Sequence, residues 1–210
     1  MVGELIHKIH KGLAMAHDEE ALPEQDNKAL AQSYFEKGKL YRKNLQYEQA
    51  RTSYEKAAAL QPDNSLYAND AGSINETLAR YKQAIDYYEL ALASDLKTYG
   101  EEHPKVAIRL NNIGTSWHEL GEYHKAIEYF ELALASDLKT YDEEHPNVAI
   151  YRNNIGMAWD SLSEYRKAIE YYELALVSEL KTNGAEYPQV ALYRNNIGVA
   201  WQSLGEHNKA

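Results

Sequence analysis

The stretch NNIGTSWHELGEYHKAIEYFELAL, residues 111–134, decides the fold because it recurs along the chain. It returns as NNIGMAWDSLSEYRKAIEYYELAL at residues 153–176 and begins again as NNIGVAWQSLGEHNKA at residues 195–210. The three copies therefore start 42 residues apart. A period of this length is typical of arrays of paired helices, in which each repeat packs only on its neighbours. We expect an all-α fold, a right-handed α-solenoid of stacked helix–turn–helix repeats.

Small, aromatic and proline residues recur at fixed positions in these copies. The small residues should let the paired helices approach closely; they are Gly72, Gly114, Gly156 and Gly198, then Ala84, Ala126, Ala168 and Ala210. The aromatic residues should fill the space around them; they are Trp117, Trp159 and Trp201, with Tyr88, Phe130 and Tyr172. The prolines should end one helix and suit the first turn of the next; they are Pro104, Pro146 and Pro188.

Two kinds of repeat follow one another in this sequence. Residues 31–64 resemble one tetratricopeptide repeat (TPR) of the usual 34-residue length, with its small residue at Gly38 and Pro62 at its end. From Ser65 onward the period is 42, and we expect the extra residues to extend the second helix of each pair. This longer repeat, with its HPxVA and NN motifs, resembles the repeats of kinesin light chains and their bacterial relatives.

The repeats define the expected organisation of the chain. Residues 1–25 should form an N-terminal capping helix and linker, because Leu5, Ile6, Ile9, Leu13 and Ala16 share one helical face. Residues 26–210 should form the array, with repeats at 31–64, 65–106, 107–148 and 149–190 and a half repeat at 191–210. Because the last copy stops halfway, we expect either a piece of a longer protein or self-association through the open half repeat.

Composition excludes several classes of function. The net charge of −10 argues against nucleic acid or an anionic membrane as partner, since binding phosphate requires a clustered basic face. The chain contains no Cys, which excludes disulfides, thiolate zinc sites and cysteine nucleophiles. No stretch approaches the roughly 18 consecutive apolar residues of a membrane span, and no signal peptide is present, so we expect a cytoplasmic protein.

Paired asparagines recur once in each long repeat and are the main candidates for partner binding. An asparagine amide offers donors and an acceptor together, which matches the backbone of an extended peptide. In kinesin light chains matching asparagines face the cargo groove, so the resemblance implies that role for Asn111, Asn112, Asn153, Asn154, Asn195 and Asn196. Asn69 is a further candidate that fits less well, because its neighbour Asp70 has a carboxylate, which cannot donate, in place of the second amide. The alternative is that these amides bond neighbouring helices.

Two positions beside the asparagines depart from the repeated pattern. Arg152 and Arg194 stand where the repeat at residues 107–148 has Leu110, and Tyr151 and Tyr193 stand where it has Arg109. These residues could select an acidic or aromatic ligand. The alternative is a side chain whose stem packs on the helix while its charge stays in water.

The sequence shows no arrangement typical of catalysis or of a cofactor. Glu101, Glu102 and His103 offer carboxylate and imidazole groups, but solvated helix ends explain them better than a metal site. There is no Gly-rich phosphate loop, no nucleophile elbow and no HExxH motif. We therefore predict no enzymatic activity, no metal and no cofactor.

The function predicted from these observations is a non-catalytic scaffold or adaptor that binds a protein or peptide segment in the concave face of its repeats. Bacterial relatives of kinesin light chains suggest tubulin-like cytoskeletal filaments as one kind of partner. Two alternatives remain open: a peptide-sensing regulator, and the recognition segment of a larger signalling enzyme.

Overall fold

The computed structural model describes residues 24–205, and within that range the chain forms nine α-helices and no strand. The helices are α2 (Glu24–Lys43), α3 (Tyr47–Leu60), α4 (Ser65–Thr77), α5 (Tyr81–Tyr99), α6 (Pro104–Glu119), α7 (Tyr123–Asp137), α8 (Pro146–Ser161), α9 (Tyr165–Asn183) and α10 (Pro188–Ser203). The predicted all-α class is confirmed. The expected capping helix at residues 4–17 and the small residue Ala210 lie outside the described range.

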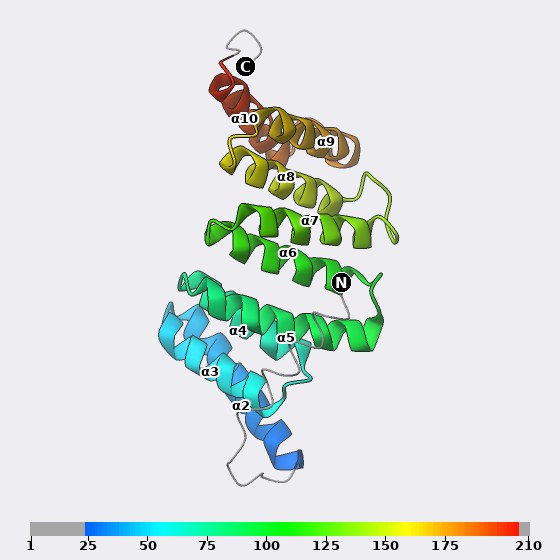
Figure 1. Cartoon of the computed structure of the whole chain (residues 1–210). Coiled ribbons are helices and arrows are strands. Elements are labelled where there is room, and N and C mark those ends of the chain that lie inside the picture. Colours follow the sequence, from blue (N-terminus) through cyan, green and yellow to red (C-terminus); the bar gives the residue numbers. More distant parts are fainter. Residues whose placement is uncertain (1–23, 206–210) are drawn as a thin grey trace. The chain divides into compact units, whose positions relative to one another are not determined.

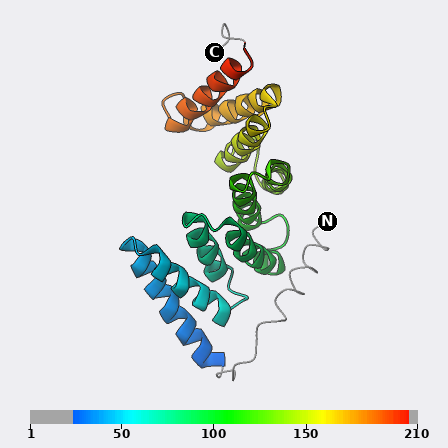
Figure 2. The ribbon, with the colours of Figure 1, turned by 60° about the vertical axis from the view of Figure 1, so that its left-hand side comes forward.

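The chain divides into two compact units, one ending at Thr98 and the other beginning at Tyr99. Consecutive helices pack against one another in each unit (Figures 1 and 2). The first unit contains the pairs α2–α3 and α4–α5, and the second contains α6–α7, α8–α9 and the single helix α10.

Glycines of the first helix in each pair lie directly under aromatic rings of the second. A Cβ atom added to Gly38 would lie 2.7 Å from the ring of Tyr54, and one added to Gly72 would lie 2.6 Å from the ring of Tyr88. Gly114 and Gly156 have the same relation to Phe130 and Tyr172, each at 2.7 Å; in all four pairs the aromatic residue follows the glycine by 16 positions. The expectation that small residues permit close helix pairs is confirmed, and no larger residue fits without moving a ring.

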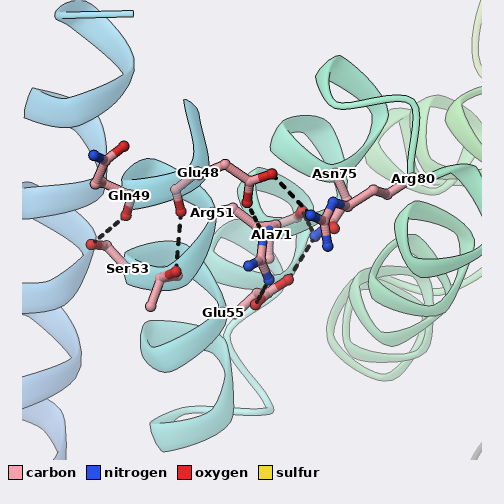
Figure 3. A network of polar contacts seen from close by, with 9 residues as sticks. Glu48, Gln49, Arg51, Ser53, Glu55, Ala71, Asn75 and Arg80 are labelled. Carbon is pink, nitrogen blue, oxygen red and sulfur yellow. Dashed lines mark hydrogen bonds and ion pairs between the residues drawn. The ribbon is translucent and has the colours of Figure 1, made fainter. Parts of the chain in front are cut away.

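A polar network joins α3 to α4 in the first unit (Figure 3). Arg51 binds the carboxylates of Glu48 at 2.9 Å and Glu55 at 2.6 Å, and its hydrogen bond lowers the pKa of Glu48. Glu55 also accepts from Asn75 Nδ2 at 3.0 Å, while Glu48 accepts from Arg80 at 2.9 Å. Because Asn75 is fully buried and also donates to the Ala71 carbonyl, this network fixes the position of α4 on α3.

Two of the first helices, α6 and α8, begin with a His–Pro pair. His103 and His145 are the N-cap residues of α6 and α8, and their Nδ1 atoms accept from the backbone N–H groups of Lys105 and Asn147 at 3.2 and 3.3 Å. The following prolines occupy the first helical turn, as predicted. In α10 the N-cap residue is Tyr187, which makes no side-chain cap bond.

The second helices differ in how far they extend. Helices α5 and α9 have 19 residues against 14 in α3, which confirms the predicted extension for these two. Helix α7 has only 15, so the expectation fails there. The physical reason is visible at the helix end: Gly100 and Gly184 adopt the left-handed φ values of 83° and 82° just beyond α5 and α9, whereas Asp142 takes this position after α7. Directly after α7 the backbone forms bonds that span three residues: Lys139 N donates to the Ser136 carbonyl at 3.3 Å and Thr140 N to the Asp137 carbonyl at 3.0 Å.

Hydroxyl groups on the second helices, or just beyond the end of α7, hold the loop that precedes the first helix of the same repeat. Ser136 Oγ and Thr140 Oγ1 donate to the carbonyls of Glu101 and Glu102, both at 2.7 Å. The next repeat repeats both bonds: Ser178 donates to the Glu143 carbonyl and Thr182 to the Glu144 carbonyl. The acidic pairs that could have suggested a metal site therefore belong to anchored loops.

Candidate partner-binding face

Five aliphatic side chains of the second unit are exposed at repeated positions of its first helices. Three of them occupy one position of the repeat and two occupy a position seven residues later; they are Ile108 (38% exposed), Ile150 (42%) and Leu192 (50%), with Met157 (40%) and Val199 (47%). Residues seven apart lie on the same face of an α-helix. We call these five side chains the exposed first-helix face.

The paired asparagines form hydrogen bonds between successive first helices. Asn154 Nδ2 on α8 donates to Asn111 Oδ1 on α6 at 2.9 Å, and Asn196 Nδ2 on α10 donates to Asn153 Oδ1 on α8, also at 2.9 Å. The second asparagine of each repeat thus donates to the first asparagine of the preceding repeat. For these two pairs the alternative interpretation, that the amides bond neighbouring helices, describes the contacts.

The other predicted asparagines have different surroundings. Asn195 is exposed on α10 and Asn112 is half-buried on α6. Asn69 lies on α4 in the first unit, where its Nδ2 donates to Asp70 Oδ1 at 3.2 Å. The asparagines available beside the exposed first-helix face are therefore those of α6, α8 and α10.

Arg152 is buried and holds a loop rather than facing solvent. Its guanidinium donates to Ser178 Oγ at 2.7 Å and to the Glu143 carbonyl at 3.3 Å, and it pairs with the Glu143 carboxylate at 3.3 Å. Only 7% of the residue is exposed, which corrects the alternative of a charge left in water. Arg194, at the same position of the next repeat, is exposed and has no ion-pair partner within residues 24–205.

Tyr151 and Tyr193 are also buried, each 2% exposed. Like Arg152, they therefore offer little surface to a partner. Each lies near a buried acid, Asp137 or Glu179 respectively. Burial raises the pKa of Tyr193 to about 12, with a further contribution from the Glu179 carboxylate. These acids were missed from the sequence, although Asp95, Asp137 and Glu179 recur at one position of the second helices.

A second acid–tyrosine relation varies between the repeats. Tyr88 OH donates to Glu76 at 3.0 Å, and Asp160 raises the pKa of Tyr172, whose main cause is burial. In the intervening repeat the acid is replaced by His118 and the tyrosine by Phe130. His118 instead contacts Ser161 Oγ at 3.1 Å, between α6 and α8.

Neither metal-ligand clusters nor membrane helices occur in the described part of the chain. Between residues 24 and 205, no three His, Cys, Asp or Glu side chains are grouped closely enough to hold a metal ion. No helix in that range combines the length and the apolar character needed to cross a bilayer.

Comparison with known proteins identifies the repeats. Tetratricopeptide repeat profiles match residues 64–139 and 110–177, and a further one matches residues 31–64. No relative among curated proteins matches the sequence.

Solved structures with the same fold include TPR-like repeats of kinesin light chain type. A kinesin light chain with nearly identical TPR-like repeats from Podosopora anserina has a TM-score of 0.72 at 20% identity, covering 87% of this chain and 90% of its own. BtubC (BKLC) from P. vanneervenii has a TM-score of 0.75 at 20% identity, covering 99% of this chain and 83% of its own. The apo form of RapI has a TM-score of 0.74 at 19% identity, covering 85% of this chain and 65% of its own.

These likenesses concern the fold, whereas the profile matches concern the sequence. The long-repeat matches together span residues 64–177, more than half of the 210-residue chain. Glycine–aromatic pairs and successive antiparallel helices are present in both units, as that family requires. The chain belongs to the tetratricopeptide repeat family, and its long repeats have the fold of kinesin-light-chain-like repeats.

Proposed function

We propose that this protein is a non-catalytic adaptor that binds a segment of a partner protein on the exposed first-helix face of its second unit. The TPR fold supports a protein–protein interaction scaffold in general. The observation that carries the specific proposal is the recurrence of exposed aliphatic side chains at the same repeat positions on α6, α8 and α10. A solvated scaffold gains nothing from exposing Ile, Leu and Val in register, whereas burying them against a partner is favourable.

The chemistry of this face defines the kind of segment that would bind. Ile108, Ile150 and Leu192 would contact apolar side chains of the partner. Each asparagine amide beside them carries two N–H donors and an acceptor oxygen, and this combination suits a peptide backbone. Arg194 would attract a carboxylate near α10. The partner is therefore an apolar segment with an acidic residue toward one end.

The proposal is tested by placing a charge on this face and on a matched site elsewhere. Ile150→Glu and Leu192→Glu change side chains that are 42% and 50% exposed, and Leu174→Glu changes one that is 47% exposed on the second helix α9. All three should keep their helicity and melting temperature close to those of the parent chain, because none fills the core.

Affinity capture from the native cytoplasm, with mass spectrometry of the retained proteins, should then separate the variants. A partner retained by the parent chain and by Leu174→Glu, but lost with Ile150→Glu and Leu192→Glu, would support the proposal. Tubulin-like filament subunits are the first candidates to examine, because of the resemblance to bacterial relatives of kinesin light chains. Equal recovery with all variants would contradict binding at this face.

A further inference from the structure

Three side chains of the exposed first-helix face form a column across the repeats of the second unit. Ile108, Ile150 and Leu192 occupy one repeat position on α6, α8 and α10, and they are 38%, 42% and 50% exposed. We call them the aliphatic column. Ile150 is exposed although α9 and α10 follow it in the chain, so the exposure belongs to the repeat and not to the last helix. A bound segment must therefore offer one apolar side chain to each repeat.

The distance between successive first helices sets the spacing of those apolar side chains. The first helices are direct neighbours, because Asn154 on α8 donates to Asn111 on α6 at 2.9 Å and Asn196 on α10 donates to Asn153 on α8 at 2.9 Å. Cα atoms of α6 and α8 also approach within 8 Å of one another. The axes of helices in direct contact lie about 8–10 Å apart, so successive side chains of the aliphatic column should lie about 8–10 Å apart.

The polyproline II helix is the regular conformation that presents a residue to one face at this interval. It has three residues per turn and rises about 3.1 Å per residue, so every third residue shares a face and recurs at about 9.3 Å. In an extended strand three residues span about 10 Å, but successive side chains alternate between the two faces, so the third residue points away. An α-helix returns to the same face after seven residues, at about 10.5 Å, which lies above the interval.

The polar residues beside the aliphatic column favour the same conformation over an α-helix. Asn112 and Asn154 are half-buried and follow Ile108 and Ile150 by four positions, which places them one turn away on the same helix face. Their amides suit a backbone that makes no internal hydrogen bonds, as in a polyproline II helix, whereas the backbone of an α-helix is already bonded. These asparagines and the aliphatic residues carry no charge, so the residues of the segment that face them should be uncharged as well.

We propose that the segment bound on the exposed first-helix face is a polyproline II helix with an aliphatic residue at every third position. This inference rests on the proposed function and specifies its partner. Each aliphatic residue of the segment packs beside one side chain of the aliphatic column, and backbone groups of the segment bond to the asparagine amides. A proline after each aliphatic residue holds that residue in the extended region that this conformation requires.

Labelled peptides that differ in the placement of their leucines test the proposal. The peptide LPQLPQLPQ presents its leucines on one face of a polyproline II helix, and LPLPLPQQQ has the same composition with leucines at every second position. In fluorescence anisotropy with the full chain, the first should bind at least tenfold more tightly than the second, because the burial of one leucine corresponds to about tenfold in affinity. A third peptide, LQAEAAKLQAEAAKL, presents three leucines on one face of an α-helix and should bind no better than the second.

Variants of the protein locate the binding site. Ile150→Glu changes the middle of the aliphatic column and should weaken the binding of LPQLPQLPQ tenfold or more, whereas Leu174→Glu on α9 should leave it unchanged. Both side chains are exposed, at 42% and 47%, so both variants should stay folded. No binding of LPQLPQLPQ, equal binding of the first two peptides, tighter binding of the helical peptide, or binding unaffected by Ile150→Glu would overturn the proposal. A native partner lost with Ile150→Glu in the affinity capture would support the proposed function in each of these cases, so the two can fail separately.

Discussion

The same substitution at two equivalent glycines should have opposite effects on stability. Gly156 lies under the ring of Tyr172, whereas an added Cβ at Gly198 meets no described atom within 4 Å. Both glycines belong to the same NNIGxAW segment of a first helix, which reads NNIGMAW and NNIGVAW in the two repeats. At Gly198, alanine should stabilise the chain by about 1 kcal/mol, which is the difference in helix propensity. At Gly156 that same gain must be set against a clash.

The size of the clash follows from the contacts. A Cβ on residue 156 would lie 2.7 Å from two ring carbons of Tyr172 and 3.2 Å from the Ala168 carbonyl oxygen. Tyr172 is only 2% exposed, so its ring cannot move into solvent. Overpacking of this kind costs about 1–3 kcal/mol. Because helix propensity cancels between the two variants, Gly156→Ala should be less stable than Gly198→Ala by about 1–3 kcal/mol.

Thermal melting followed by circular dichroism measures this difference. For a chain of this size about 2–4 °C corresponds to 1 kcal/mol, so the two midpoints should differ by between about 2 and 12 °C. Gly114→Ala, under Phe130, should behave like Gly156→Ala and serves as a replicate. Equal midpoints for Gly156→Ala and Gly198→Ala would refute the role of the glycine–aromatic contact.

Three other predictions concern the helix N-caps, the asparagine bonds between first helices and the buried tyrosines. His145→Ala removes the N-cap bond of α8 and should lower the free energy of unfolding in urea titrations by about 1 kcal/mol. Tyr187→Ser supplies an N-cap side chain to α10 and should raise that free energy. No change in either variant would show that these caps contribute nothing to stability. Asn154→Ala removes the hydrogen bond to Asn111 and should lower the free energy of unfolding by about 1 kcal/mol, whereas Asn195→Ala changes an exposed side chain and should have little effect. Similar effects of both would argue against a stabilising role for the Asn154–Asn111 bond. Burial raises the pKa of Tyr87 and of Tyr193 to about 12, above the ordinary value near 10, so the stability from their neutral forms should be present below about pH 10 and lost as pH rises toward 12. Tyr193→Phe should lose less free energy of unfolding over this interval than the parent chain. An identical alkaline profile for the two would contradict burial of the Tyr193 hydroxyl.

The fold could be predicted because the signals that determine it repeat. The same types of residue stand 42 positions before Gly156 and Tyr172, and before His145 and Pro146. Because each signal occurs more than once, the pattern is not accidental. The end of α7 was not predictable in this way, because it depends on one local replacement, Asp142 for glycine, within an otherwise matching segment.

The candidate site was harder to predict because burial depends on contacts between repeats. Arginine is usually a surface residue, and Arg152 is buried only because Ser178 and the loop that contains Glu143 contact it. Asn153 and Asn154 are adjacent in sequence, yet they bond to opposite neighbours, Asn196 and Asn111. Periodicity identified the candidate residues, but it did not predict which of them are exposed to solvent.

The direction of the asparagine bonds has a consequence for how such a chain can grow. The repeat at residues 149–190 contains both halves of the contact: Asn153 accepts from the repeat after it, and Asn154 donates to the repeat before it. A tandem duplication of 42 residues therefore produces a new unit whose donor already matches the acceptor of its parent, and whose own acceptor awaits the next copy. No compensating substitution is needed for this contact at the new junction, so gene duplication alone can lengthen the protein without loss of the asparagine bond between first helices.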